Sequence, residues 1–402
     1  MVKNIFLLIV TLCSLSSIAQ VQRCATKMHN TENTSQLRTL AEPQGIITIP
    51  IVVHVVYNTS NPIENVSDAQ IYSQIAVLNR DYRFKNEDTI DIPSHFRSVA
   101  ADCEINFCLA TKDPSGNPTT GIIRKATTKN NVGSDLTEAV KTESPSWDRS
   151  KYLNIWVCEI EQSGNVLGYA YSGSDAVSIP AKDGVVIDYR VFGDIGTGNT
   201  YIEFAKGRTT THEIGHYFEL IHIWGDDEDN ANKCGLSDNV DDTPNQSINT
   251  TGCPSGIYTD ACSPNAYGRM YQNYMDYTDD ACMIMFTQGQ KTRMRQGISL
   301  YRSGLLTSNK CTYTQVTDNT LFDILPYPNP TNDLLHISIS APDTYPVLAT
   351  VMDMWGQTLL IQNINFKDFN ASTFNVSDLP AGMYWIQLQQ GNRSAQHTFV
   401  KL

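Results

Sequence analysis

The sequence lacks any block of basic residues. Its 29 lysines and arginines are outnumbered by 42 aspartates and glutamates, which gives a formal net charge of −13. Such a chain offers no concentrated positive surface to nucleic acid or to an anionic membrane. We therefore expect neither as a partner, and expect carboxylate-rich loops to suit cations instead.

Long apolar runs are also missing after the first twenty residues. No later segment reaches the roughly eighteen consecutive apolar residues of a membrane-spanning helix, so we predict no transmembrane segment. The opening MVKNIFLLIVTLCSLSSIAQ combines Lys3, a short apolar run and the small-residue site Ser-Ile-Ala. This pattern predicts a secretory signal peptide over residues 1–19, cleaved before Gln20.

The chain has no internal repeat, and 402 residues are too many for one average domain. After the signal peptide we predict a polar prosegment over residues 20–45, a large domain over 46–312 and a linker over 313–324. Residues 325–402 alternate apolar and polar positions between turn signals, which predicts a small all-β sandwich.

The large domain has the pattern of an α+β fold. It begins with the β-rich run IITIPIVVHVVY, followed by SDAQIYSQIAVLNRDY with apolar residues at helical spacing. Strand-like segments recur at 105–110, 153–158 and 184–189. Residues 225–282 are rich in Asp, Asn, Gly, Pro and Cys, which predicts long loops held by disulfides or ions.

The cysteine count is odd once Cys13 leaves with the signal peptide. Cys24 stands near the start, and the other eight cysteines lie between Cys103 and Cys311. In an oxidising compartment these eight can all pair, so we expect Cys24 to be the thiol left over. The sequence does not determine how Cys103, Cys108, Cys158 and Cys311 pair.

The segment THEIGHYFELIHIWGDD, residues 211–227, holds three of the eight histidines. Residues four apart share a helix face, so His212 and His216 can direct two imidazoles at one metal ion, with Glu213 beside them to hold a water. A bare HExxH pentapeptide also occurs by chance in core helices. The third histidine, His222, argues against that interpretation.

His222 lies about 600° of helical rotation beyond the second histidine, so it reaches the same ion only if the chain turns sharply near residues 218–219. Glycine makes such a left-handed turn at little cost, whereas Glu219 incurs about 1–2 kcal/mol. A metal site worth on the order of 10 kcal/mol can hold that strain. A later glutamate ligand is excluded, because none follows Glu228, and Asp226 remains an alternative third ligand.

Three neutral imidazoles leave the fourth position of a tetrahedral zinc ion open for water, whose pKa zinc lowers toward 7. Glu213 is placed to take that proton and pass it to a leaving amine. The sequence thus predicts one catalytic zinc and peptide-bond hydrolysis. Further on, NYMDYTDD places Met275 in a tight turn, where a methionine alone is usually an ordinary packing residue.

These segments resemble the pappalysin-like metzincin metalloproteases, in their ulilysin and mirolysin branch. The likeness over residues 46–312 is carried by GRTTTHEIGHYFELIHIWGD, NYMDY, CGLSDNVDDTPNQ, VVHVVYN and LGYA. It implies an α+β metzincin-type zincin catalytic domain: a twisted sheet, an active-site helix and a loop-rich C-terminal subdomain. The family usually has Gly, or in some members Asn, where Glu219 stands.

The resemblance also implies residue roles. His212, His216 and His222 would bind zinc, Glu213 would be the general base, and Met275 would support the metal from below. Tyr277 would steady the tetrahedral intermediate. The implied structural and binding features are the disulfides Cys234–Cys262 and Cys253–Cys282, a calcium site of Asp238, Val240, Asp242 and Thr243, and a substrate-binding edge strand with Gly168, Tyr169 and Ala170.

Asp279 and Asp280 follow the methionine turn, beneath which metzincins bind the side chain just after the cut bond. A buried carboxylate there is satisfied by a substrate cation. The resemblance gives this role to Asp280 and implies cleavage on the amino side of arginine and lysine. The alternative is that both aspartates face water or bind calcium.

The two ends of the chain carry further resemblances. QRCAT resembles the prosegment motif whose cysteine, here Cys24, binds zinc in latent members, with Ala25 in place of the usual Gly. It implies a zymogen opened near residues 36–46; the alternative is a thiol with no role. The motifs YPNPTNDLL, LPAGMYWIQL and FVKL resemble the C-terminal sorting domains of type IX secretion, which implies that export machinery as a partner. The alternative is a carbohydrate-binding or adhesive sandwich.

We therefore predict a secreted or surface-attached zinc endopeptidase that acts on proteins or peptides and is made as a zymogen. A protein of another class, a surface binding or adhesion protein on a weakened protease scaffold, is the alternative, with Glu219 as the first sign of decay. Retention of the three histidines, Glu213 and Tyr277 argues against it.

Overall fold

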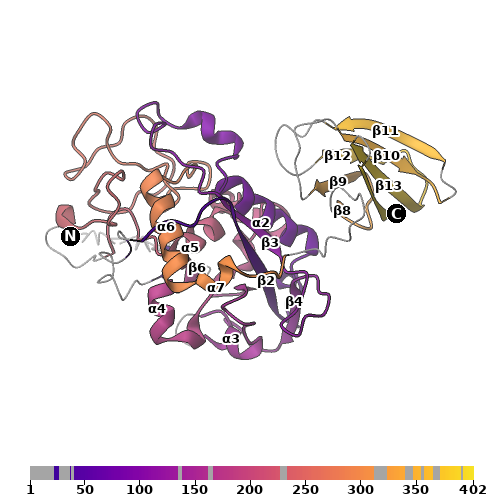
Figure 1. Cartoon of the computed structure of the whole chain (residues 1–402), viewed down its shortest axis with the longest axis horizontal. Coiled ribbons are helices and arrows are strands. Elements are labelled where there is room, and N and C mark those ends of the chain that lie inside the picture. The colour runs from indigo at the N-terminus through magenta and orange to yellow at the C-terminus, as the bar shows by residue number, and fades with distance from the viewer. Residues whose placement is uncertain are drawn as a thin grey trace, which may run out of the picture.

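The structure is a computed structural model, and it describes residues 22–26, 37, 40–134, 138–161, 166–226, 233–311, 324–339, 347–354, 357–364, 372–390 and 393–402. The predicted signal peptide and nearly all of the predicted linker lie outside these residues. The described chain forms an α+β domain followed by an all-β domain (Figure 1). Within these ranges, no helix has both the length and the apolar character needed to cross a bilayer.

The large domain is built on a twisted sheet whose described strands number seven, in the order β1-β6-β7-β5-β2-β3, with β4 also paired to β2. The long strand β2 (Ile47–Asn58) pairs parallel with β3, β4 and β5, and its run of β-branched residues is buried on both faces. Strand β6 runs antiparallel to β7. The remaining strands are β1 (Gln22–Cys24), β3 (Ile105–Leu109), β4 (Ile122–Thr127), β5 (Leu153–Cys158), β6 (Val166–Ala170) and β7 (Val185–Asp188).

Three longer helices pack around this sheet. Helix α2 (Asp68–Asp81) begins after Ser67, whose hydroxyl accepts the N–H of Gln70 and so caps the helix. Helix α5 (Arg208–Tyr217) packs against α2, β6 and β7. Helix α6 (Gln288–Tyr301) begins with a capping box. The shorter helices are α3 (Ala139–Glu143), α4 (Gly173–Ser178) and α7 (Ser303–Leu306), and 3-10 turns lie at Pro62–Glu64, Glu87–Asp91, Pro180–Lys182, Tyr189–Val191, Gly196–Asn199, Ile202–Phe204 and Lys233–Gly235.

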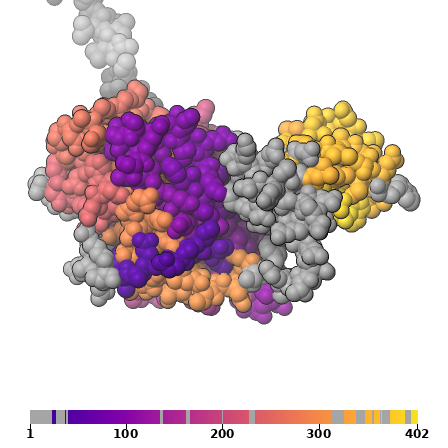
Figure 2. All heavy atoms as spheres, turned by 45° about the horizontal axis from the view of Figure 1, so that its top comes forward, coloured from indigo at the N-terminus to yellow at the C-terminus, as the bar shows by residue number. Residues whose placement is uncertain are grey.

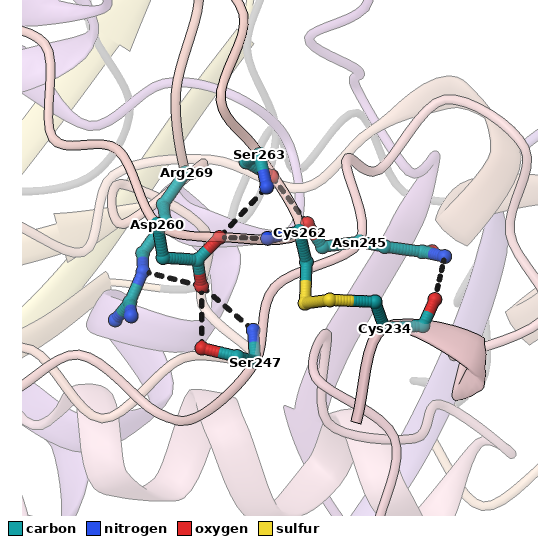
Figure 3. Close-up of a disulfide and its surroundings, with 7 residues drawn as sticks. All are labelled: Cys234, Asn245, Ser247, Asp260, Cys262, Ser263 and Arg269. Atoms are coloured by element: carbon teal, nitrogen blue, oxygen red, sulfur yellow. Dashed lines mark hydrogen bonds and ion pairs between the residues drawn. A yellow bond between two sulfur atoms is a disulfide. The ribbon is translucent and has the colours of Figure 1, made fainter. Parts of the chain in front are cut away.

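Between α5 and α6 the described residues form loops, as the composition predicts. The implied disulfides Cys234–Cys262 and Cys253–Cys282 are both present. Beside the first, Asp260 accepts hydrogen bonds from the backbone of Cys262 and Ser263 and pairs with Arg269 at 3.0 Å (Figure 3). Covalent and polar links therefore replace an apolar core in this subdomain.

The expectation that Cys24 alone stays outside a disulfide is wrong. Cys108 pairs with Cys311, but Cys103 and Cys158 do not pair. These two thiols are fully buried in different apolar clusters, so they do not meet. Burial raises the pKa of both, and each packs as a small neutral core residue.

The C-terminal domain is the predicted β-sandwich. Its sheets have the orders β11-β10-β13-β14 and β12-β9-β8 in the described chain, and they enclose an apolar core that includes Leu335, Ile386 and Phe399. In Figure 2 its yellow residues form a body at the opposite end of the molecule from the salmon-coloured loops. Its strands are β8 (Ile324–Tyr327), β9 (Leu334–Ile339), β10 (Val347–Met352), β11 (Thr358–Ile364), β12 (Ser372–Asn375), β13 (Gly382–Gln390) and β14 (Arg393–Lys401).

Candidate metal centre and active site

Helix α5 carries the first two histidines and the adjacent glutamate. His212, Glu213 and His216 are fully buried. The first turn of the helix is a run of threonines, which are weak helix formers. Thr211 donates a 2.7 Å hydrogen bond to Asp81 of α2, so tertiary contacts hold this helix in place.

The chain turns sharply after α5, as the histidine spacing requires. Glu219 adopts a left-handed φ of 77°. Its N–H donates to the carbonyl of His216, and the N–H of Leu220 donates to the carbonyl of Gly215, which closes the end of the helix. This turn returns His222 to the other two histidines.

The three imidazoles meet at their Nε2 atoms. The Nε2 separations are 3.2 Å for His212 and His222, 3.1 Å for His212 and His216, and 3.0 Å for His216 and His222. A tetrahedral zinc ion with bonds of about 2.0–2.1 Å would set its nitrogen ligands about 3.3–3.4 Å apart. The constellation is therefore close to the size that zinc requires.

The outer Nδ1 atoms of the same rings face oxygen acceptors. His212 faces the carbonyl of Tyr274 at 2.7 Å, and His216 faces the carbonyl of Leu220 at 2.8 Å. His222 faces the carboxylate of Asp226. Burial lowers the pKa of His212 and brings that of His216 to about 3, so both rings are neutral. With protons on Nδ1, the Nε2 lone pairs converge and cannot hydrogen-bond to one another, an arrangement that suits a cation. Asp226 lies outside this convergence.

The segment around Cys24 crosses the site beside these rings. Strand β1 pairs parallel with β6, with Cys24 opposite Gly168. The thiol of Cys24 and the three histidines form one group whose candidate ligand atoms all lie within 4.8 Å of one another. Two residues on, the Thr26 hydroxyl donates to Glu213 Oε2 and accepts the N–H of Ala170, both at 2.8 Å.

Glu213 lies against strand β6. A Cβ added to Gly168 would come within 2.9 Å of its Cγ, so only glycine leaves room for this carboxylate. Burial raises the pKa of Glu213 to about 7. The neighbouring Tyr169 packs instead with Trp156 in an apolar cluster.

Met275 lies directly beneath α5. A Cβ built on Gly215 would be 2.5 Å from its sulfur, which shows how closely the helix and the turn approach. The Met275 N–H donates to Asn273 Oδ1, and Asn273 exchanges side-chain hydrogen bonds with Gln290 of α6. The turn is thus fixed from α6.

Tyr277 stands beside the histidines. Its ring centroid lies 4.9 Å from that of His222 and 4.8 Å from that of Trp224. Its hydroxyl donates to the carbonyl of Cys24 at 3.2 Å. The backbone of Cys24 therefore occupies the hydrogen-bonding position of this hydroxyl.

Asp280 is almost fully buried, and Arg23, the neighbour of Cys24, faces it. Arg23 Nη2 lies 2.6 Å from Asp280 Oδ1, and Oδ2 accepts the N–H groups of Lys206 and Arg208. The Arg23 guanidinium also lies 4.7 Å from the ring centroid of Phe204. A buried carboxylate and an aromatic ring therefore hold this guanidinium.

The suggested calcium loop gathers several oxygen atoms. Both carboxylate oxygens of Asp238 lie 2.8 Å from the Thr243 hydroxyl, which also lies 2.9 Å from the Val240 carbonyl. Burial raises the pKa of Asp238 to about 7. Asp242 instead accepts hydrogen bonds at the start of α6.

Sequence reasoning singled out Cys24 but missed its neighbours Arg23 and Thr26. Their partners, Asp280 and Glu213, lie 257 and 187 residues away in the chain. The sequence signal that could have identified them is their position: a cationic and a hydroxyl side chain lie on either side of the candidate cysteine.

Two family profiles match this chain. Residues 137–299 match the peptidase M43 family, described as pregnancy-associated plasma protein-A. Residues 326–402 match the secretion system C-terminal sorting domain. The two matches fall on the α+β domain and on the β-sandwich.

Extracellular metalloproteases are similar over most of their length. That of Pyricularia oryzae is 33% identical over 269 residues, which are 66% of this chain and 80% of the relative. That of Arthroderma benhamiae is 28% identical over 309 residues, 74% of this chain and 98% of the relative.

Solved structures of mirolysin share the fold of the α+β domain. A promirolysin mutant of Tannerella forsythia is 44% identical with a TM-score of 0.63, covering 68% of this chain and 89% of that one. Mature mirolysin of the same organism in complex with a cleaved peptide is 43% identical with a TM-score of 0.58, covering 66% and 100%. The chain therefore belongs to the peptidase M43 (pappalysin) family of metalloproteases and carries a type IX sorting domain that directs it to the cell surface or the medium.

Proposed function

We propose that this secreted metalloprotease cleaves on the amino side of arginine and lysine and is made as a latent zymogen. One observation carries both parts: the buried ion pair between Arg23 and Asp280. The prosegment holds an arginine in the pocket that a substrate arginine would use. Latency and specificity then have the same structural origin.

In this proposal the three histidines hold the zinc ion that the family implies, which when bound supplies Lewis-acid polarisation of the substrate carbonyl. Glu213 takes a proton from the attacking water and passes it to the leaving amine. Met275 supports the histidines from below. Tyr277, once released from Cys24, donates a hydrogen bond to the oxygen on which negative charge develops.

Arg23 and a substrate arginine can occupy the same place if the two chains run in opposite directions. The preferred arginine of a substrate follows the cut bond, whereas Arg23 precedes Cys24. The prosegment runs parallel to β6. A substrate that adds to the same edge in the antiparallel direction, on Gly168 and Ala170, would place its arginine where Arg23 lies. Arginine is favoured over lysine because its guanidinium can pair with a carboxylate through two nitrogens.

Three contacts support latency. The Cys24 thiol lies close enough to the three histidines to serve as a fourth ligand, Thr26 donates a hydrogen bond to the carboxylate of Glu213, and Arg23 forms an ion pair with Asp280. Burial raises the pKa of the Cys24 thiol, so a bound cation is needed to make the thiolate the favoured form. Ligand position, base and pocket are thus all occupied in the zymogen.

We also assign a structural calcium ion to the loop of Asp238, Val240, Asp242 and Thr243. Carboxylate, carbonyl and hydroxyl oxygens within six residues are the ligands that Ca²⁺ prefers. The buried Asp238 supports this assignment, because it has no cationic partner within hydrogen-bond distance among the described residues.

The alternative function, a binding protein on a decayed scaffold, started from Glu219. The left-handed conformation at this residue keeps His222 beside the other two histidines. Glu219 thus gives no sign of decay, which favours an active protease.

The test is cleavage of a peptide library by the mature protein, with and without a chelator. We expect cuts before arginine and lysine that stop on chelation and return with zinc. Asp280→Ala should lower kcat/KM for basic substrates about 100-fold or more and change neutral substrates little, with Asp279→Ala as the matched control. Equal losses on both substrates would assign Asp280 to the fold instead of the pocket.

A further inference from the structure

The carboxylate of Glu219 reaches away from the histidines toward the segment that follows the edge strand. Its Oε1 accepts the N–H of Ser174 at 2.8 Å, and its Oε2 accepts the Ser174 hydroxyl at 3.0 Å. Ser174 lies four residues after Ala170, the last residue of β6. The residue that makes the metal-site turn is therefore hydrogen-bonded to the first turn of α4, in the segment that directly follows β6.

Two glycines leave room for this side chain. A Cβ on Gly297 of α6 would lie 2.6 Å from Glu219 Cγ, and a Cβ on Gly173 would lie 3.0 Å from Glu219 Oε1. Neither glycine has a positive φ, so what each contributes here is the absence of a side chain. A glycine inside a helix such as α6 lowers helix stability by about 1 kcal/mol relative to alanine. Here its missing side chain leaves the space that the Glu219 side chain occupies.

The same two segments are joined by a second link. Arg302 donates from Nε to the carbonyl of Tyr217, the last residue of α5, at 3.0 Å. Its Nη2 donates to the carbonyl of Tyr171, directly after β6, at 3.1 Å. Glu219 is itself held by Arg293, whose Nε donates to the Glu219 carbonyl at 2.6 Å. In Figure 1 the elements concerned, β6, α4, α5 and α6, lie next to one another.

We infer that Glu219 is a positioning residue that fixes the substrate-binding edge strand relative to the metal-binding turn. This inference rests on the proposed function, because it assigns β6 to substrate binding. Glycine at position 219 would relieve the left-handed strain but would release Ser174. Relief of the strain would raise stability, whereas release of Ser174 would loosen the link between the two segments. The substitution therefore distinguishes the two effects.

The experiment compares Glu219→Gly, Glu219→Gln and Ser174→Ala in the mature enzyme on two arginine substrates, one long enough to pair along β6 and one short. Glu219→Gly should raise KM for the long peptide about fivefold to tenfold and leave kcat, the short substrate and one zinc per chain nearly unchanged. Ser174→Ala should have a smaller effect, and the double variant should not exceed Glu219→Gly. Glu219→Gln should stay close to wild type, because its amide can both accept from and donate to Ser174.

A matched control is Glu104→Gly, which relieves a left-handed glutamate (φ 56°) at another site and should leave both KM values unchanged. Hydrogen exchange supplies a readout independent of catalysis: amides of residues 171–174 should exchange faster in Glu219→Gly than in wild type. If neither KM for the long peptide nor this exchange changes, the inference is wrong. If zinc-loaded wild type cleaves no peptide but the exchange changes as expected, the proposed function fails and the link stands.

Discussion

At the scale of residues, the sequence revealed those contacts whose partners are close in the chain. The spacing of His212, His216 and His222 required a turn near 218–219, and Glu219 makes that turn. The contact of Arg23 with Asp280 could not be predicted in the same way, because nothing local in the sequence relates two residues 257 positions apart. Only the folded sheet brings them together.

Asp238 leads to a prediction about pH and calcium. Its pKa is raised by burial to about 7, so between the unfolded value near 4 and pH 7 the folded state binds more protons. Without calcium, this group should therefore lower stability as pH rises through that window, and the loss should be complete above pH 7. Calcium binds the ionised form, so its stabilising effect should be larger at pH 8 than at pH 5.

The measurement is the melting temperature from pH 5 to 8, with EGTA or with calcium. Asp238→Asn removes the titrating group and should abolish the pH dependence of the calcium effect. The assignment would be contradicted if calcium did not raise the melting temperature of the wild type, or raised it equally at pH 5 and pH 8.

At the scale of elements, periodicity and composition predicted most of the secondary structure. The segments 105–110, 153–158 and 184–189 contain β3, β5 and β7, and the composition of 225–282 correctly predicted loops. The expectation that all eight later cysteines pair was the error at this scale, whereas the two disulfides implied by the resemblance are present. Whether a buried cysteine pairs depends on which strand ends meet in space, and periodicity carries no such information.

The loop subdomain should depend on its disulfides, because it has little apolar core of its own. Replacing Cys234 and Cys262 together by serine removes a link across 28 residues. We expect a loss of about 2–4 kcal/mol, seen as a melting temperature lower by several degrees. Cys103→Ala, which removes a buried thiol outside any disulfide, is the control and should lower the melting temperature less. If a reductant leaves the wild type as stable as before, this disulfide does not support the loops.

At the scale of the whole molecule, β1 covers the outer side of β6. We propose that this arrangement is the latent form and that substrate takes the place of β1 in the mature enzyme. The order of the parts along the chain could be predicted from composition shifts. Their docking could not, since it depends on long-range contacts.

Release of the prosegment should be controlled by its contacts with the site. Cys24→Ala and Arg23→Ala should each make the full-length protein mature earlier, by about tenfold in rate, because each removes one of the three contacts. Maturation is followed by electrophoresis of freshly purified zymogen. A Cys24→Ala protein that matures at the wild-type rate would show that the thiol is not the switch.

The sorting domain gives a prediction about location. Deleting residues 325–402 should leave the protein in the periplasm, because the type IX machinery then has no domain to recognise. Cell fractionation with antibody detection measures this. Secretion of the truncated chain at the wild-type level would contradict the role of the domain in export.

The disulfide between Cys108 and Cys311 also has a mechanical consequence. Cys311 is the last described residue before the sorting domain, and Cys108 lies on β3, which pairs parallel with the central strand β2. A pulling force applied to the C-terminal domain during passage through an outer-membrane pore therefore enters the sheet at β3. Because the disulfide connects the base of the tail directly to β3, the force bypasses α6 and α7, which lie between β3 and Cys311 in the chain.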